Sequence, residues 1–96
     1  LAKGLGLADH FMGYHNPVKF VGHGVGLELN EQPILAMGQQ TEIKSGMVFA
    51  LEPKFAFPDL GVVGIENTFL VNNHGLERMT HQPDTIQTIP PPPLSV

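Results

Sequence analysis

The sequence has no cysteine, few basic residues and no long apolar run. Without cysteine, disulfide bonds and thiolate metal sites are excluded, so any metal ion must be bound by histidine, carboxylate or water. Lysine and arginine together number 5 and are scattered along the chain, and the net charge is −4. The chain therefore lacks the basic patch that nucleic acid or an anionic membrane would require, and we expect neither partner.

No stretch approaches the roughly 18 apolar residues that a membrane-spanning helix needs. The first twelve residues include Lys3, Asp9 and His10, which interrupt any signal-peptide core. We therefore expect a cytoplasmic protein. At 96 residues the chain is one domain at most, and because it begins with leucine we expect it to be part of a longer protein. Its 11 glycines and 9 prolines predict many turns and short strands.

The periodicity of the apolar residues predicts one helix followed by strands. Residues 1–12 place apolar side chains at helical spacing, so we expect the end of a helix that stops at Gly13. Alternating or continuous apolar runs predict strands further along the chain, and Asn-Asn-His-Gly at 72–75 predicts a hairpin turn. The expected strands span residues 21–29, 34–37, 47–51, 54–57, 62–71 and 76–80. Residues 83–96 form a proline-rich tail that cannot join a central strand.

Three polar residues interrupt the apolar pattern of these strands. His23 lies on an otherwise apolar face, Glu52 ends a continuous apolar run, and Glu66 lies in the middle of a strand. A buried carboxylate needs a cation or hydrogen-bond donors, because burial without compensation costs several kcal/mol, on the order of 2–7 kcal/mol for a polar group and more for a charge. A divalent metal ion would satisfy both carboxylates at once.

Each of the three residues also has an ordinary structural interpretation. A single histidine on an apolar face is commonly a satisfied core residue, and a glutamate before a proline is often exposed at a strand end. Glu66 can form an ion pair with a basic side chain, for which the candidates are Lys44, Lys54 and Arg78. Composition and periodicity alone leave these interpretations open.

Three segments, taken in order, resemble the signatures of the pita-bread metallopeptidases, the family of methionine aminopeptidase, aminopeptidase P, prolidase and creatinase. They are GHGVGLELNEQP at 22–33, GMVFALEP at 46–53 and GIENTFLV at 64–71. The resemblance covers about residues 1–80. It implies an α+β fold, a partial pita-bread in which a curved antiparallel sheet packs against an N-terminal helix. Residues 1–82 would be the C-terminal half of the catalytic domain, and 83–96 its tail.

The resemblance also implies a metal centre. In this family two divalent ions are held by two aspartates, one histidine and two glutamates. Carried over by motif, His23, Glu52 and Glu66 are the metal ligands, and Glu52 is in addition a candidate proton shuttle. A site rich in oxygen ligands with one imidazole suits Mn, Co, Fe or Zn. Because the chain supplies three of five ligands, we expect it to bind at most one ion, weakly.

The sequence departs from the family pattern in two places. Nothing matches the two aspartates, since Asp9 is too close to His23 and lacks the motif context. Asn30 stands where the family usually has a histidine that contacts the substrate. Asparagine donates a hydrogen bond but carries no proton at neutral pH, so an acid role at this position is lost. His15 is a candidate replacement, whereas the three histidines expected at the surface are His10, His74 and His81.

The leading hypothesis is a fragment of a dinuclear peptidase that hydrolyses peptide bonds at the N-terminal end of short peptides, of the Xaa-Pro dipeptidase or aminopeptidase type. We expect the chain alone to be inactive. The alternatives are a pseudo-enzyme that binds peptides or protein partners, favoured by Asn30, and a small non-catalytic β domain. A half-domain would also expose apolar surface, so we expect a homo-oligomer.

Overall fold

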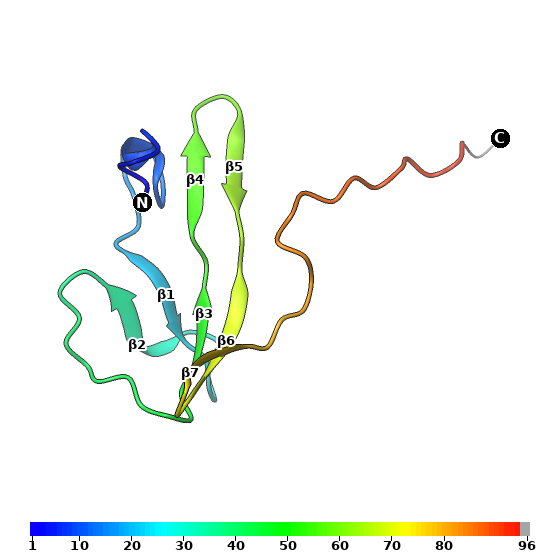
Figure 1. Ribbon diagram of the computed structural model, residues 1–96. Helices are drawn as coiled ribbons and strands as arrows, with labels where there is room; N and C mark the ends of the chain where they lie inside the picture. The colour runs from blue at the N-terminus through cyan, green and yellow to red at the C-terminus, as the bar shows by residue number, and fades with distance from the viewer. Residues whose placement is uncertain (95–96) are drawn as a thin grey trace.

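The computed structural model describes residues 1–94, and its regular secondary structure is almost entirely antiparallel strands (Figure 1). One short 3-10 turn, η1 (Ala8–His10), precedes the strands. The strands are β1 (Phe20–Gly24), β2 (Glu31–Ala36), β3 (Val48–Leu51), β4 (Lys54–Phe57), β5 (Gly61–Gly64), β6 (Asn67–Asn72) and β7 (Gly75–Arg78).

The strands form two sheets that share one long hairpin. Five strands pair in the order β2-β1-β3-β6-β7, and β4 pairs with β5. Figure 1 shows β3 leading into β4 along one arm and β5 leading into β6 along the other. The pairing is interrupted between Leu51↔Asn67 on one side and Lys54↔Gly64 on the other. Residues 52–53 and 65–66 therefore face each other at a break in the hairpin.

Proline explains why the ladder breaks at this point. Pro53 has no backbone N–H to donate, so it cannot contribute a full pair of ladder hydrogen bonds. Its carbonyl oxygen still accepts a hydrogen bond from the Ile65 N–H at 3.1 Å, which holds the two arms together across the break. On the other side, the Glu52 N–H donates to the Val21 carbonyl at 2.9 Å and ties this arm to β1.

Several predicted strands are confirmed. The run at 47–51 is β3, the segment at 54–57 is β4, and the short extended piece at 34–37 belongs to the longer β2. The predicted hairpin turn joins β6 to β7, with the pair Asn72↔Gly75 closing it. The predicted strand 62–71 is wrong in one respect, because it is two strands, β5 and β6, separated by Ile65 and Glu66.

The predicted strand 21–29 is wrong over its second half, because β1 ends at Gly24. Beyond it the chain bends, and the Gly26 N–H donates to the Glu28 carbonyl at 3.1 Å across a tight turn. Leu27 and Leu29, which the alternating pattern assigned to a buried face, are 106% and 83% exposed. The alternation is real, but the Val25 N–H, which donates to the Val48 carbonyl at 2.9 Å, makes the last hydrogen bond to β3 before the chain turns away from the sheet.

The expected N-terminal helix is not confirmed. Within residues 1–94, the first twelve form turns and η1, and the backbone leaves the helical region at Gly6 (φ 71°) and Met12 (φ 60°). Two glycines in this short stretch cost about 1 kcal/mol each in a helix, which a segment of three turns cannot recover without extensive packing. The segment instead docks on β4, where the Met12 N–H donates to the Lys54 carbonyl at 2.8 Å and Phe11 bridges to Phe55.

The buried core is small. Its apolar members are Met12, Phe49 and Ala50, each at most 3% exposed, and His23 is the buried polar residue. Large apolar side chains lie at the surface instead, which confirms the expected exposed apolar surface; the most exposed are Leu1, Leu27, Met37, Leu60, Ile86 and Leu94. Among the described residues, no helix has the length and hydropathy to cross a membrane.

We predict that Phe49→Ala destabilises the chain by about 3–5 kcal/mol, because it removes the largest side chain of this core and leaves a cavity. Leu60→Ala is the matched control, since Leu60 is 88% exposed and should change the free energy of unfolding little. Urea unfolding followed by circular dichroism measures both. Equal shifts of the two unfolding midpoints would contradict the assigned core.

Candidate metal centre

The strand registers place the three candidate ligands on one face of the sheet. His23 in β1 pairs with Ala50 in β3, and Ala50 pairs with Thr68 in β6. Glu52 lies two residues after Ala50, and Glu66 lies two residues before Thr68. Because side chains alternate between the faces of a strand, residues two apart point to the same side. All three ligand candidates are therefore directed to the face that carries the His23 imidazole.

Side-chain positions confirm this convergence. One ligand atom from each of His23, Glu52 and Glu66 lies within 4.8 Å of the others. His23 Nε2 is 3.8 Å from Glu52 Oε2, and the two side chains are 8% and 25% exposed. Glu66 is exposed and completes the group at the break between β5 and β6. The three side chains range from buried (His23) to exposed (Glu66), so the group is accessible from solvent on one side.

The imidazole of His23 is oriented by its own backbone neighbour. His23 Nδ1 lies 3.0 Å from the Gly24 carbonyl oxygen, and because a carbonyl only accepts, Nδ1 carries the hydrogen. In the neutral imidazole, Nε2 then presents its lone pair to the Glu52 carboxylate. Two acceptors at 3.8 Å make no hydrogen bond with each other. A cation between them satisfies both, and a backbone carbonyl behind the ring is the usual arrangement of a metal-binding histidine.

The donor set fits a divalent metal ion. It combines one imidazole with two carboxylates and no sulfur, a combination that suits Mn, Co, Fe or Zn. A protonated imidazole paired with Glu52 would satisfy those two residues as well, but it would leave the Glu66 carboxylate beside a second carboxylate without a cation of its own.

Glycines on either side of His23 let the neighbouring strands approach closely. A Cβ atom at Gly22 would lie 2.5 Å from the Ala50 carbonyl oxygen and 2.8 Å from a Leu51 methyl carbon. At Gly24 it would lie 2.6 Å from the Gln32 carbonyl oxygen. The pairing of β1 with β2 also shifts register on both sides of His23. Close strand approach and irregular pairing therefore both occur at these glycines.

The other predicted site residues do not join this group. Asn30 is exposed in the loop before β2, and His15 is exposed in the N-terminal loop with φ 64°, its ring against Tyr14 at 4.0 Å between centroids. Asp9, the nearest aspartate to His23 in the sequence on its N-terminal side, is exposed in η1.

One prediction about the remaining histidines is wrong. His74 and His81 are exposed as expected, but His10 is half-buried. Its ring stacks on Tyr14 and on Phe57, at 5.0 and 4.8 Å between centroids, and its Nδ1 donates to the Ala56 carbonyl at 2.8 Å. Tyr14 is close in sequence, but Phe57 and the Ala56 carbonyl belong to the distant strand β4, so local sequence could not show that His10 is covered from that side.

The interpretation of this chain as an ordinary β domain predicted ion pairs between its glutamates and basic side chains. Between the residues that the structure describes, Arg78–Asp84 is an ion pair, whereas His23 and Glu52 would form one only with a protonated imidazole. Arg78, a candidate partner of Glu66, is thus paired with the tail. The geometry does not support that interpretation, because His23 lies beside the two glutamates rather than far from them.

Known proteins share both the fold and the sequence. Prolidase from Pyrococcus furiosus superimposes with a TM-score of 0.75 at 38% identity, over 85% of this chain and 23% of that chain. Xaa-Pro dipeptidase from Bacillus anthracis gives a TM-score of 0.76 at 32% identity, over 88% of this chain and 22% of its own. The fold is therefore that of the pita-bread peptidases, represented here by part of their sheet.

Sequence comparison agrees. The curated Xaa-Pro dipeptidase of Pyrococcus furiosus is 39% identical over 80 residues, which are 83% of this chain and 21% of that protein. Residues 3–73 match the model of metallopeptidase family M24. The chain belongs to this family. It spans about a fifth of the length of the curated relatives it matches.

We predict that Gly22→Ala destabilises the chain by about 1–3 kcal/mol and weakens Mn²⁺ binding, because the added methyl group forces β1 and β3 apart at the ligand face. Gly4→Ala is the control, since a Cβ there meets only the Leu1 carbonyl oxygen at 3.5 Å. Urea unfolding and titration calorimetry measure the two effects. Equal behaviour of the two variants would show that close strand approach is not needed.

Proposed function

We propose that the whole protein is a metal-dependent peptidase that hydrolyses peptide bonds at the N-terminal end of short peptides, of the Xaa-Pro dipeptidase or aminopeptidase type. The observation that carries this proposal is the convergence of His23, Glu52 and Glu66 within 4.8 Å on one face of a sheet. Relatives in family M24 that bear the name Xaa-Pro dipeptidase support the substrate class.

The proposed roles follow from position and chemistry. His23 presents Nε2 to the centre while the Gly24 carbonyl holds its Nδ1–H. Glu66 approaches from the break in the hairpin, and Glu52, beside the imidazole, is also placed to accept and return a proton during hydrolysis. Divalent ions at such a site supply Lewis-acid chemistry, polarising a carbonyl and lowering the pKa of water. The remaining ligands would come from outside this chain, so the chain alone would hold at most one ion.

Asn30 and His15 are proposed to act on the substrate rather than on the metal. Asn30 lies exposed in the loop directly before β2 and is able to donate a hydrogen bond to a peptide carbonyl, without the acid role that histidine would have there. His15 would replace that role only if the exposed N-terminal loop moved toward the sheet. The exposure of both residues leaves them available to a ligand.

The first test is activity of the whole protein loaded with Mn²⁺ or Co²⁺. It should cleave Xaa-Pro dipeptides, and His23→Ala should lose both the metal and at least about 100-fold in kcat/KM, because one imidazole ligand is removed. His74→Ala is the control, since His74 is exposed in the β6–β7 turn. The 96-residue chain alone should be inactive. A metal-replete whole protein that cleaves no such peptide would contradict the proposal.

A pseudo-enzyme that binds peptides is the second candidate, and Asn30 in place of the expected histidine favours it. Metal analysis of the purified whole protein separates the two functions. The enzyme must retain divalent ions, and it must lose them on His23→Ala, whereas a binding module has no such requirement.

We also propose that the isolated chain self-associates through its exposed apolar side chains, among them Leu27, Met37 and Leu60. Size-exclusion chromatography with light scattering should show a mass above the 10.4 kDa of the monomer that falls on dilution. Leu60→Lys should reduce association, because it places a charge on the apolar surface. A well-folded monomer at all concentrations would contradict this prediction.

A further inference from the structure

Glu66 lies where the sheet itself does least to fix the backbone. The β4–β5 ladder ends at Gly64 and the β3–β6 ladder resumes at Asn67. Between them, the Ile65 N–H donates to the Pro53 carbonyl at 3.1 Å. A residue that must aim its carboxylate at two other side chains therefore needs support from elsewhere.

That support comes from a chain of hydrogen bonds directly after Glu66. Asn67 Nδ2 donates to Asp84 Oδ1 at 3.1 Å, Thr80 Oγ1 donates to Asn67 Oδ1 at 2.5 Å, and the Thr68 N–H donates to Thr80 Oγ1 at 3.3 Å. The directions are fixed by chemistry, because a carboxylate only accepts. Asp84 therefore turns the Asn67 amide nitrogen toward itself, which leaves the amide oxygen for the Thr80 hydroxyl.

Arg78 completes this hydrogen-bond network and connects it to the tail. Arg78 Nη1 donates to Asp84 Oδ2 at 2.9 Å and Nε donates to the Thr80 carbonyl at 2.6 Å. Nη2 donates to the Gln82 carbonyl. One guanidinium thus holds three points of the chain between β7 and the tail, a use of its fixed fork of donors that lysine cannot reproduce.

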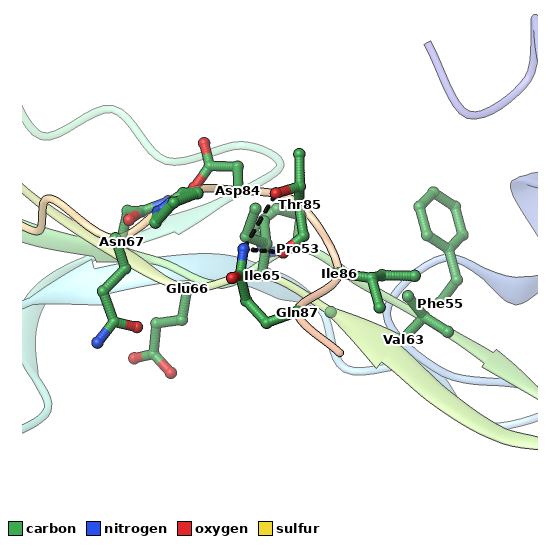
Figure 2. Close-up of a pocket in the computed structure, with 13 residues that line it drawn as sticks. Pro53, Phe55, Val63, Ile65, Glu66, Asn67, Asp84, Thr85, Ile86 and Gln87 are labelled. Carbon is green, nitrogen blue, oxygen red and sulfur yellow. Dashed lines mark hydrogen bonds between the residues drawn. The ribbon is translucent and has the colours of Figure 1, made fainter. Parts of the chain in front are cut away.

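Figure 2 shows where this network lies relative to the ligand face. The Glu66 carboxylate points to one side of the strand, and Asp84 and Thr85 lie on the other. Residues 82–87 and the hairpin arms, Glu66 included, line a cavity of about 560 Å³. The tail is thus attached behind the metal ligand rather than in front of it, so it does not obstruct the candidate centre.

We propose that Asn67, Arg78, Thr80 and Asp84 are positioning residues for Glu66, which fix the backbone at 67–68 from behind so that the carboxylate faces His23 and Glu52. The inference rests on the proposed function, since it takes Glu66 as a metal ligand. It goes further in giving the tail residue Asp84 a part in metal binding. Metal binding and attachment of the tail are then coupled, and each strengthens the other.

The first test is Mn²⁺ affinity, measured by titration calorimetry on the metal-free whole protein. Thr80→Val keeps the side-chain shape but removes the hydroxyl, and Asp84→Asn removes the charge that orients Asn67. Both should weaken binding about 10-fold or more, the usual effect of losing a partner that orients a ligand. Thr80→Ser keeps the hydroxyl and should bind Mn²⁺ as the wild type does. Asp59→Asn, the same charge change in the exposed β4–β5 turn, should also have no effect.

The second test is tryptic cleavage of the peptide bond after Arg78. Trypsin must bind the Arg78 guanidinium, which the network holds in place. In the wild type, Mn²⁺ should slow cleavage after Arg78 while leaving cleavage after Lys44, in an exposed loop, unchanged. In Asp84→Asn, cleavage after Arg78 should be fast with or without Mn²⁺.

The outcomes separate the two proposals. If Thr80→Val and Asp84→Asn lower the Tm but bind Mn²⁺ normally, and Mn²⁺ does not protect Arg78, the network is merely structural and the inference is overturned. If His23→Ala also binds Mn²⁺ normally, the metal centre itself is wrong, and the inference falls with the proposed function. Weak binding by His23→Ala and by Thr80→Val, restored in Thr80→Ser, supports both.

Discussion

The break in the long hairpin at Pro53 is the constraint on which the candidate centre depends. A continuous ladder from β3 through β4 would hold the chain flat and pair every residue with one across the sheet. Because proline cannot complete that ladder, Glu52 and Glu66 lie at a gap where two sheets meet. The same gap leaves room for the side chains to turn toward His23 on the adjacent strand. Two carboxylates placed together in this way repel each other, whereas a cation between them would attract both.

Local sequence patterns predicted most of the strands, and they failed where contacts with other strands determine the structure. The segments at 47–51 and 54–57 were predictable because each apolar run ends at a residue that cannot continue it. The strand over 62–71 was predicted as one piece since its alternation passes unbroken through Ile65 and Glu66. Nothing in that stretch reveals that its partner contains Pro53, which interrupts the ladder from the opposite arm. The N-terminal helix failed for a related reason, since its apolar spacing is real but its glycines and its docking on β4 favour turns.

The candidate ligands were predictable from the sequence, whereas their orientation was not. His23, Glu52 and Glu66 interrupt apolar strands and fall in three ordered motifs, and both signals are local. The contact of His23 Nδ1 with the Gly24 carbonyl depends on the register shift between β1 and β2, which no single segment encodes. Arg78 was one of the three basic residues considered as a partner for Glu66. The structure pairs it with Asp84, a residue that composition assigned to a proline-rich tail.

Metal binding and folding are linked in a chain of this kind. Of the three ligand candidates, His23 lies in β1, Glu52 directly after β3 and Glu66 directly before β6, up to 43 residues apart in the sequence. The unfolded chain cannot hold these groups together, so the free energy of binding an ion adds to the free energy of folding. The apolar core contributes little to the free energy of folding, because its buried part consists of three side chains among the described residues. A metal ion bound by all three candidates would therefore stabilise the sheet at the point where its ladder is interrupted.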